Sequence, residues 1–418
     1  MRRWAGLAIC GVLLIVTPLA ARRMGLGAAT QIGGGASDDE LAKVTRKGFS
    51  KNVSPPPLEG LDLTRLKVTD DGVFAAAHGE RLAKTTLDPA LQAQAERVLK
   101  DAEIPEAAVV MADTRTGRIL AYASVTKTAK TRDLNVEASA PAASIFKIVT
   151  GSTLVERAGL SESTRQCYWG GEHKLELKNL VDDPKRDKWC ATVAEAMGRS
   201  LNTVFARLAL KHLDGPAITG VGKGYGFGAP LAFDVPVEPS TIEFPEDKLG
   251  FARTAAGFWN TTLSPVHAVA LATAVANKGL LLRPVVVESV VDDGTTIYKG
   301  PSRQVLGRAV KAETATSVTK MMEATVADGT SYKAFHDGAG QAYIPGVSIA
   351  GKTGTLTKQS TEQFYTWFVG FAPSRDPEIS ISVLAINKAT WKTKANTVAR
   401  RMLQAYFAKK GTPGVKAP

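Results

Sequence analysis

The chain has 418 residues, of which 44% are hydrophobic and 22% charged, so it can form one large or two ordinary domains and is not a disordered protein. Its formal net charge of +12 could suit nucleic acid or an anionic surface. Because no helix-turn-helix, RNP or zinc-finger pattern accompanies the charge, we expect no nucleic-acid partner.

The first predicted element is an uncharged segment, residues 4–21, flanked by arginine pairs on both sides. A segment of this length can just span a membrane, and its small C-terminal residues would also fit a signal peptide. Because two arginines follow directly, cleavage is disfavoured, and we interpret residues 1–23 as a membrane anchor, with a cleaved signal segment as the alternative. Either interpretation places the remainder outside the cytoplasm.

Residues 24–80 are predicted to be an exported linker. They contain Gly-Gly-Gly, an acidic cluster and Pro-Pro-Pro. A folded domain is expected over residues 81–410, followed by a short tail at 411–418.

Two cysteines, Cys167 and Cys190, lie in the exported part, whereas Cys10 lies in the apolar segment. Because exported thiols oxidise, we predict that Cys167 and Cys190 form a disulfide, which would stabilise the fold by roughly 3 kcal/mol. Two buried free thiols are the alternative. The five histidines have no ligand partners at suitable spacing, so we expect neither a metal site nor a cofactor.

Within the domain, apolar periodicity and turn residues predict a mixed order of helices and strands. In chain order we expect a helix from Pro89, strands at 107–112 and 119–123, a mainly helical part at about 145–260, a helix at 265–279, strands at 364–371 and 379–386, and a closing helix. Strands at both ends of a helical middle predict a sheet assembled from distant parts of the chain.

Three serine–lysine pairs with S-x-x-K spacing begin at Ser124, Ser144 and Ser317. An S-x-N motif at residues 200–202 and a K-T-G-T motif at 352–355 follow the second pair in that order. Ser317 has no S-x-N motif before K-T-G, and Ser124 ends a predicted strand, where its lysine would not share a face with it. The three motifs therefore single out Ser144.

The pattern at Ser144 suits nucleophilic catalysis. On a helix, Lys147 shares a face with Ser144, and a lysine made neutral by burial can act as its base. Ser144 at a helix N-terminus would also offer its own N–H to an oxyanion. Ser200 can relay a proton, and Asn202 can hold a substrate amide or Lys147.

The K-T-G-T motif offers groups for substrate binding. Lys352 adds a positive charge opposite a substrate carboxylate, and Thr353 and Thr355 add hydroxyls. Gly354 has no side chain, so a substrate could pair against the strand edge, and the Thr355 N–H would be a second oxyanion donor.

On these motifs the sequence resembles the transpeptidase domain of penicillin-binding proteins. Further similar segments lie at 86–99, 109–124, 200–210, 263–279, 326–335, 349–355 and 367–373. The resemblance implies an α+β fold in which helices flank a central antiparallel sheet, with an inserted helical subdomain and the site between them. The roles given above to seven motif residues are the family's roles at matching positions: Ser144, Lys147, Ser200, Asn202, Lys352, Thr353 and Thr355.

The resemblance implies that Ser144 attacks the D-Ala-D-Ala carbonyl of a peptidoglycan stem peptide and that an amine on a neighbouring strand receives the acyl group. β-Lactams would then be covalent inhibitors. Three alternatives remain open: a D,D-carboxypeptidase, a β-lactamase, or a β-lactam sensor or scaffold without turnover.

The resemblance also implies a bacterial cell envelope, with the catalytic domain outside the inner membrane or secreted. Many relatives carry a glycosyltransferase domain or a long pedestal before the transpeptidase. The residues before the predicted domain are too few for either, so we expect a separate glycan polymerase as partner.

Overall fold

The computed structural model describes residues 56–127, 132–172, 174–388 and 393–418. The predicted anchor and most of the predicted linker lie outside the described residues, as does Cys10. No described helix is long and apolar enough to cross a bilayer.

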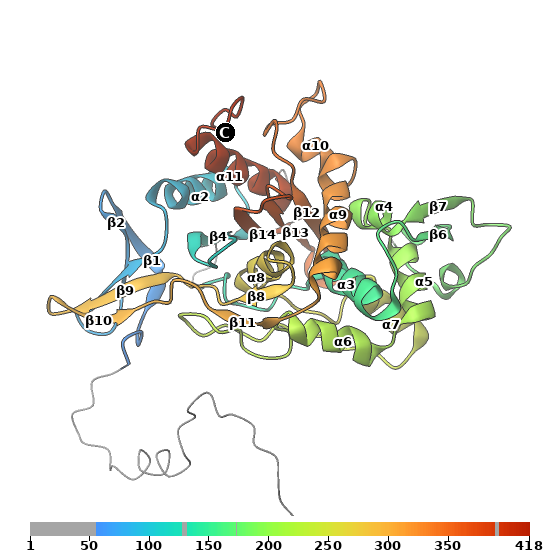
Figure 1. Ribbon diagram of the computed structural model, residues 1–418, viewed down its shortest axis with the longest axis horizontal. Helices are drawn as coiled ribbons and strands as arrows, with labels where there is room; N and C mark the ends of the chain where they lie inside the picture. The colour runs from blue at the N-terminus through green and yellow to red at the C-terminus, as the bar shows by residue number, and fades with distance from the viewer. Residues whose placement is uncertain (1–55, 128–131, 173, 389–392) are drawn as a thin grey trace, which may run out of the picture. The chain divides into compact units, whose positions relative to one another are not determined.

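A five-stranded antiparallel sheet combines strands from both ends of the domain (Figure 1). Its order is β12 (Ala350–Lys358), β13 (Gln363–Ala372), β14 (Ile379–Asn387), β4 (Glu106–Asp113) and β5 (Ile119–Thr126). The hairpin of β4 and β5 and the strands β13 and β14 confirm the strands expected from the sequence. The chain leaves this sheet after β5 and returns to it only at β12, which is an edge strand.

Both faces of this sheet are buried, which explains why its central strands are continuous apolar runs. In β4, Ala108 and Val110 join a core that contains α8 (Pro265–Ala276), whereas Val109 and Met111 join a second core. Helices α2 (Pro89–Asp101) and α11 (Ala395–Lys409) supply the second core. Successive side chains of a strand point to opposite faces, so the sheet lies between α8 and the α2–α11 pair.

The segment between β5 and α8 is mainly helical and forms the expected subdomain. It contains α3 (Lys147–Ala158), α4 (Val193–Gly198), α5 (Asn202–His212), α6 (Gly215–Gly224), α7 (Lys248–Ala255) and the 3₁₀ turns η1 (Ala143–Phe146) and η2 (Leu177–Leu180). A hairpin of β6 (Arg165–Tyr168) and β7 (Trp189–Thr192) interrupts it. The α+β architecture predicted from the sequence is confirmed.

A second sheet begins within the predicted linker, so the expected boundary at residue 80 is wrong. Its order is β1 (Asp62–Thr69), β2 (Gly72–Ala76), β3 (Leu82–Thr85), β9 (Val287–Asp292) and β10 (Thr295–Lys299). Val73 and Ala75 of β2 are fully or almost fully buried. Because β3 pairs with β9 some 200 residues later in the sequence, local periodicity alone could not reveal that the folded region begins before residue 80.

The remaining elements connect the two sheets and close the domain. They are β8 (Leu280–Leu282) paired with β11 (Val305–Arg308), α9 (Ala312–Ala327), α10 (Tyr332–Phe335) and η3 (Gln359–Thr361). Helix α9 packs between the helical subdomain and β12, because it contacts α4, α3 and β12.

Candidate active site

Ser144 lies in the 3₁₀ turn η1, and Lys147 is the first residue of α3. The sequence predicts an α-helix here, whereas the structure has a tighter 3₁₀ turn. This turn favours contact between the side chains of Ser144 and Lys147. In a 3₁₀ turn, residues three apart are eclipsed, so both side chains leave the same side of the backbone. The Nζ atom of Lys147 lies 2.9 Å from Ser144 Oγ.

Lys147 is completely buried and has two further oxygen partners. Its Nζ atom donates to Asn202 Oδ1 at 2.7 Å and to the carbonyl of Ala256 at 2.5 Å. The Phe205 ring centre lies 5.7 Å away. Burial, and then the nearby Lys352, hold the pKa of Lys147 well below its ordinary value.

Ser200 follows the C-cap of α4 in a left-handed backbone conformation, with φ 58°. Its N–H donates to the Met197 carbonyl, and the N–H of Leu201 donates to the Ala196 carbonyl. This is the Schellman pattern, in which glycine is the usual residue at the left-handed position. Serine at this position is strained by about 1 kcal/mol relative to glycine. Its hydroxyl faces Lys352 of β12.

Lys352 lies in β12 and is also completely buried. Its Nζ atom lies 3.0 Å from Ser200 Oγ and 2.8 Å from the Thr353 carbonyl. Burial lowers the pKa of Lys352 to about 7. The positive charge that the sequence predicts at Lys352 therefore depends on pH near neutrality.

The remaining K-T-G-T residues lie at the edge of the central sheet. Thr353 Oγ1 is 2.6 Å from Thr330 Oγ1, and Thr355 is exposed. A Cβ atom at Gly354 would lie 3.1 Å from the Cβ of Ala143, next to Ser144. The missing side chain of Gly354 thus serves the packing of β12 against η1, in addition to the edge access predicted from the sequence.

Ser144, Ser200, Asn202, Thr353, Gly354 and Thr355 line one cleft with a volume of about 920 Å³. Lys147 and Lys352 are fully buried and contact the hydroxyls of Ser144 and Ser200 in its wall. The walls also include Tyr168, Glu172, Arg199, Trp259, Thr330 and Asn396. Sequence reasoning missed Thr330 and the backbone carbonyls of Ala256 and Glu172. A carbonyl belongs to every residue type, so no sequence signal could have identified the last two.

The other two S-x-x-K pairs have different surroundings. Lys127 is exposed and donates to the Glu103 carbonyl, and Ser124 lies in β5, as the sequence predicts. Lys320 forms an ion pair with Glu162, which raises its pKa. Both lysines therefore lack the burial that makes Lys147 a candidate base.

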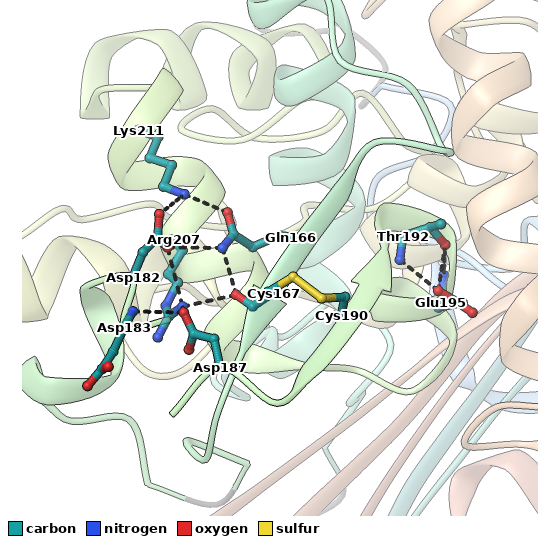
Figure 2. The surroundings of a disulfide bond; sticks show 10 residues. All are labelled: Gln166, Cys167, Asp182, Asp183, Asp187, Cys190, Thr192, Glu195, Arg207 and Lys211. Atoms are coloured by element: carbon teal, nitrogen blue, oxygen red, sulfur yellow. Dashed lines mark hydrogen bonds and ion pairs between the residues drawn. A yellow bond between two sulfur atoms is a disulfide. The ribbon is translucent and has the colours of Figure 1, made fainter. Parts of the chain in front are cut away.

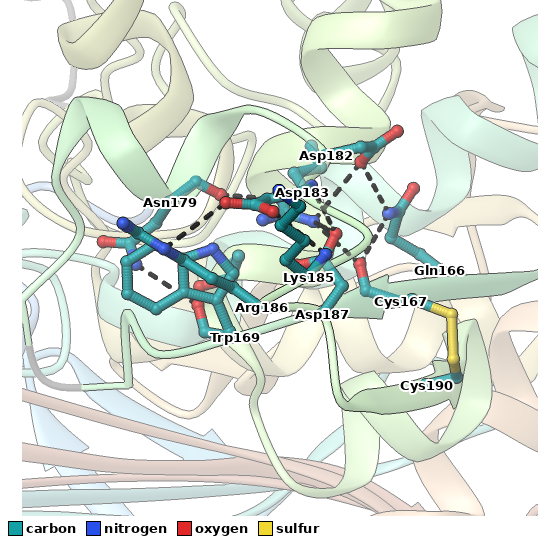
Figure 3. A network of polar contacts seen from close by, with 12 residues as sticks. Gln166, Cys167, Trp169, Asn179, Asp182, Asp183, Lys185, Arg186, Asp187 and Cys190 are labelled. Atoms are coloured by element: carbon teal, nitrogen blue, oxygen red, sulfur yellow. Dashed lines mark hydrogen bonds and ion pairs between the residues drawn. A yellow bond between two sulfur atoms is a disulfide. The ribbon is translucent and has the colours of Figure 1, made fainter.

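A disulfide joins Cys167 and Cys190, which face each other in the β6–β7 hairpin (Figure 2). Beside it, the buried Arg207 of α5 forms ion pairs with Asp182 and Asp187. The loop between the two cysteines extends to the cleft, where it contributes Glu172. In the same loop Arg186 lies over the Trp169 ring, 5.0 Å from its centre (Figure 3).

The fold and the site together define a serine–lysine protein whose cleft lies between an antiparallel sheet and a helical subdomain. The chain belongs to the family described as the penicillin binding protein transpeptidase domain, whose sequence model matches residues 107–404. The resemblance predicted from the three motifs is confirmed.

Relatives of known identity are distant. Stage V sporulation protein D of Bacillus subtilis is 26% identical over 356 residues, covering 79% of this chain and 50% of that protein. Peptidoglycan D,D-transpeptidase PbpA of Mycobacterium tuberculosis is 27% identical over 280 residues, covering 63% and 54%. The chain therefore spans about half the length of these relatives.

Solved structures share the fold. The D,D-transpeptidase domain of a peptidoglycan glycosyltransferase from Eggerthella lenta has a TM-score of 0.67 at 25% identity, covering 79% of this chain and 83% of that chain. The imipenem acyl-enzyme complex of penicillin-binding protein A from M. tuberculosis has a TM-score of 0.63 at 23% identity, covering 77% and 79%.

Proposed function

We propose that the protein is a D,D-transpeptidase that cross-links peptidoglycan stem peptides through an acyl-enzyme at Ser144. The observation that carries the proposal is the set of contacts of Lys147, a buried amine beside a serine hydroxyl. In the proposed reaction, Ser144 Oγ attacks the D-Ala-D-Ala carbonyl and passes its proton to Lys147, and the terminal D-Ala leaves. An amine of a second stem peptide then displaces Ser144 from the acyl ester.

The hydrogen-bond inventory of Lys147 supports its role as the base. A neutral amine has two N–H donors and one lone pair. The Ala256 carbonyl and Asn202 Oδ1 can only accept hydrogen bonds, so each accepts one from the two N–H groups of the neutral amine. The lone pair is then left for the third neighbour, Ser144 Oγ, whose proton it can accept.

The second half of the site supports proton return and substrate binding. Ser200 Oγ lies beside Lys352, so it can relay a proton toward the leaving amine. Protonated Lys352 would face the carboxylate of the terminal D-Ala or of a β-lactam. The Thr353 carbonyl accepts a hydrogen bond from Lys352 Nζ, and residues two apart in a strand direct their backbone groups to the same edge. We therefore expect the Thr355 N–H to face the free edge of β12 as an oxyanion donor, together with the Ser144 N–H.

The proposal includes a location and partners. Relatives with this domain are named as peptidoglycan transpeptidases, which supports the cell envelope, peptidoglycan stem peptides as substrates and β-lactams as covalent inhibitors. We further propose that residues 1–23 anchor the chain in the inner membrane, with the domain on the outer side, and that a separate glycan polymerase supplies the strands. The disulfide between Cys167 and Cys190 fits this oxidising location.

The test is acylation and turnover by the purified full-length chain, with Ser144→Ala as the control. We expect a fluorescent penicillin to give a stable mass adduct that Ser144→Ala lacks. With a D-Ala-D-Ala donor and an amine acceptor, we expect a cross-linked peptide in excess of the hydrolysed donor. Hydrolysis alone would identify a carboxypeptidase, and an adduct that clears within seconds a β-lactamase. An adduct without any peptide turnover would identify a sensor, and no adduct would refute the active serine.

A further inference from the structure

The amide of Asn202 is held between Lys147 and a backbone carbonyl. Its Nδ2 donates to the Glu172 carbonyl at 2.7 Å, and its Oδ1 accepts from Lys147 Nζ at 2.7 Å. An amide offers a donor on one side and an acceptor on the other, so the Glu172 carbonyl decides which side faces Lys147. A reversed amide would direct its N–H groups at the lysine lone pair and block the base.

The Glu172 carbonyl belongs to residues 169–172, here called the rim segment, whose last residue lines the cleft. Thr203, the neighbour of Asn202 in α5, donates from Oγ1 to the Gly170 carbonyl at 2.6 Å. Gly170 and Gly171 have φ values of 58° and 78°, and a Cβ at Gly171 would lie 2.1 Å from Thr203 Oγ1. The rim segment therefore passes directly over Thr203 and is fixed by it.

Arg207, one turn further along α5, fixes the part of the loop that supports the rim segment. Its Nε donates to the Asn179 carbonyl at 2.7 Å, and its Nη1 donates to the Cys167 carbonyl at 2.9 Å. Asn179 in turn donates from Nδ2 to the Trp169 carbonyl at 3.2 Å (Figure 3). The Arg207 side chain is fully buried, and Asp187, itself 6% exposed, pairs with it at 2.7 Å. One guanidinium thus connects the loop on both sides of the rim segment (Figure 2).

We propose that Thr203 and Arg207 are positioning residues for acylation, which hold the rim segment so that the Glu172 carbonyl orients the Asn202 amide and the Lys147 lone pair faces Ser144. This inference rests on the proposed function. In this proposal three residues of α5 act together. Asn202 contacts Lys147, and Thr203 and Arg207 hold the backbone segment that orients the Asn202 amide.

The helix also provides a matched control. Lys211, one turn beyond Arg207, contacts Gln166 Oε1 of strand β6 (2.7 Å) and Asp182 Oδ2 of the same loop (2.6 Å). Both residues lie outside the rim segment. Asp182 also pairs with Arg207 at 3.3 Å, but Arg207 has a shorter pair with Asp187 and donates to the Asn179 and Cys167 carbonyls, contacts that do not involve Lys211. Lys211→Met should therefore remove a loop contact from the same helix without affecting the orientation of Asn202.

The experiment measures the second-order rate constant of acylation by fluorescent penicillin in the full chain, with thermal unfolding as the folding check. Thr203→Val, which keeps the shape and removes the hydroxyl, should slow acylation by about tenfold or more, whereas Lys211→Met should leave it near the wild-type value. Arg207→Met should slow it further, and Arg207→Lys should be intermediate because an ammonium cannot reproduce the fork of the guanidinium.

A double-mutant cycle distinguishes positioning from general loosening. If Thr203 acts through the amide, Thr203→Val should cause no further loss in an Asn202→Ala background. An equal loss in both backgrounds, or a Thr203→Val rate within about twofold of wild type, would overturn the inference. Failure of the wild-type chain to acylate at all would refute the proposed function instead.

The pH profile supplies a second readout. In Thr203→Val, Lys147 should lose Asn202 Oδ1 as an acceptor, which disfavours its ammonium form and lowers its pKa. The acid limb of the acylation pH profile, where Lys147 becomes protonated, should therefore move to lower pH. A merely loosened and wetter site would favour the ammonium and move the limb to higher pH, which would contradict the inference.

Discussion

Ser200 Oγ lies 3.0 Å from Lys352 Nζ, although one residue follows helix α4 of the subdomain and the other lies in the edge strand of the sheet. The contact joins the two walls of the cleft. It depends on the left-handed backbone of Ser200, a conformation that glycine would adopt without strain. The site therefore keeps a serine at a position where stability alone favours glycine.

Ser200→Gly should separate stability from activity. Relief of the left-handed strain should raise the free energy of unfolding by about 1 kcal/mol. Loss of the hydroxyl should slow acylation by about a hundredfold, because the proton relay is removed. Thermal unfolding and penicillin acylation measure the two effects. Ser200→Ala is the control, since it loses the hydroxyl but keeps the strain; an equal stability gain in both variants would contradict the argument.

Asn202→Asp should convert the neighbour of Lys147 from a neutral acceptor into an anion. The carboxylate stabilises the ammonium form, so the pKa of Lys147 should rise and the acid limb of acylation should move to higher pH. Near neutral pH we expect acylation to slow by about a hundredfold. Asn202→Ala should also be slow but without an upward shift of the limb. Identical pH profiles for the two variants would argue against Lys147 as the base.

The titration of Lys352 should change the pH dependence of acylation for β-lactams that carry a carboxylate. Because burial lowers the pKa of Lys352 to about 7, the ammonium loses its proton as pH rises through that value. Acylation by a carboxylated penicillin should then fall by about tenfold between about pH 6 and pH 9. A penicillin methyl ester has no carboxylate to attract and should lack this decline. Parallel profiles for the two compounds would exclude a role for Lys352 in carboxylate binding.

Removal of the disulfide should lower stability. The bond closes a loop with a sequence separation of 23 residues, and the chain-entropy model gives roughly 3 kcal/mol for a loop of this size. Cys167→Ser combined with Cys190→Ser should therefore unfold several degrees below the wild type. Cys10→Ser is the matched control and should unfold at the wild-type temperature, and a thiol assay should find both exported cysteines oxidised in the wild type. An unchanged unfolding temperature in the double variant would contradict the prediction.

Much of the fold followed from local patterns. Helices begin at Pro89 and Pro265 as predicted, and the preceding residues, Asp88 and Ser264, cap them. The apolar strands β13 and β14 were equally clear, because both faces of the sheet are buried. The small sheet was not predictable, since β3 finds its partner β9 some 200 residues away and strand pairing at that distance leaves no local period.

The sequence by itself identified the residues that we propose carry the chemistry, because the order of three short motifs selected Ser144 among three S-x-x-K pairs. Only the tertiary structure decided their chemical state. Complete burial lowers the pKa of Lys147 and of Lys352, and burial depends on distant elements packing together. The Ala256 carbonyl accepts a hydrogen bond from Lys147, and the Glu172 carbonyl accepts one from the Asn202 amide. A backbone carbonyl is present in every residue, so the sequence does not mark either one. Their role arises only where the folded backbone brings them to the lysine.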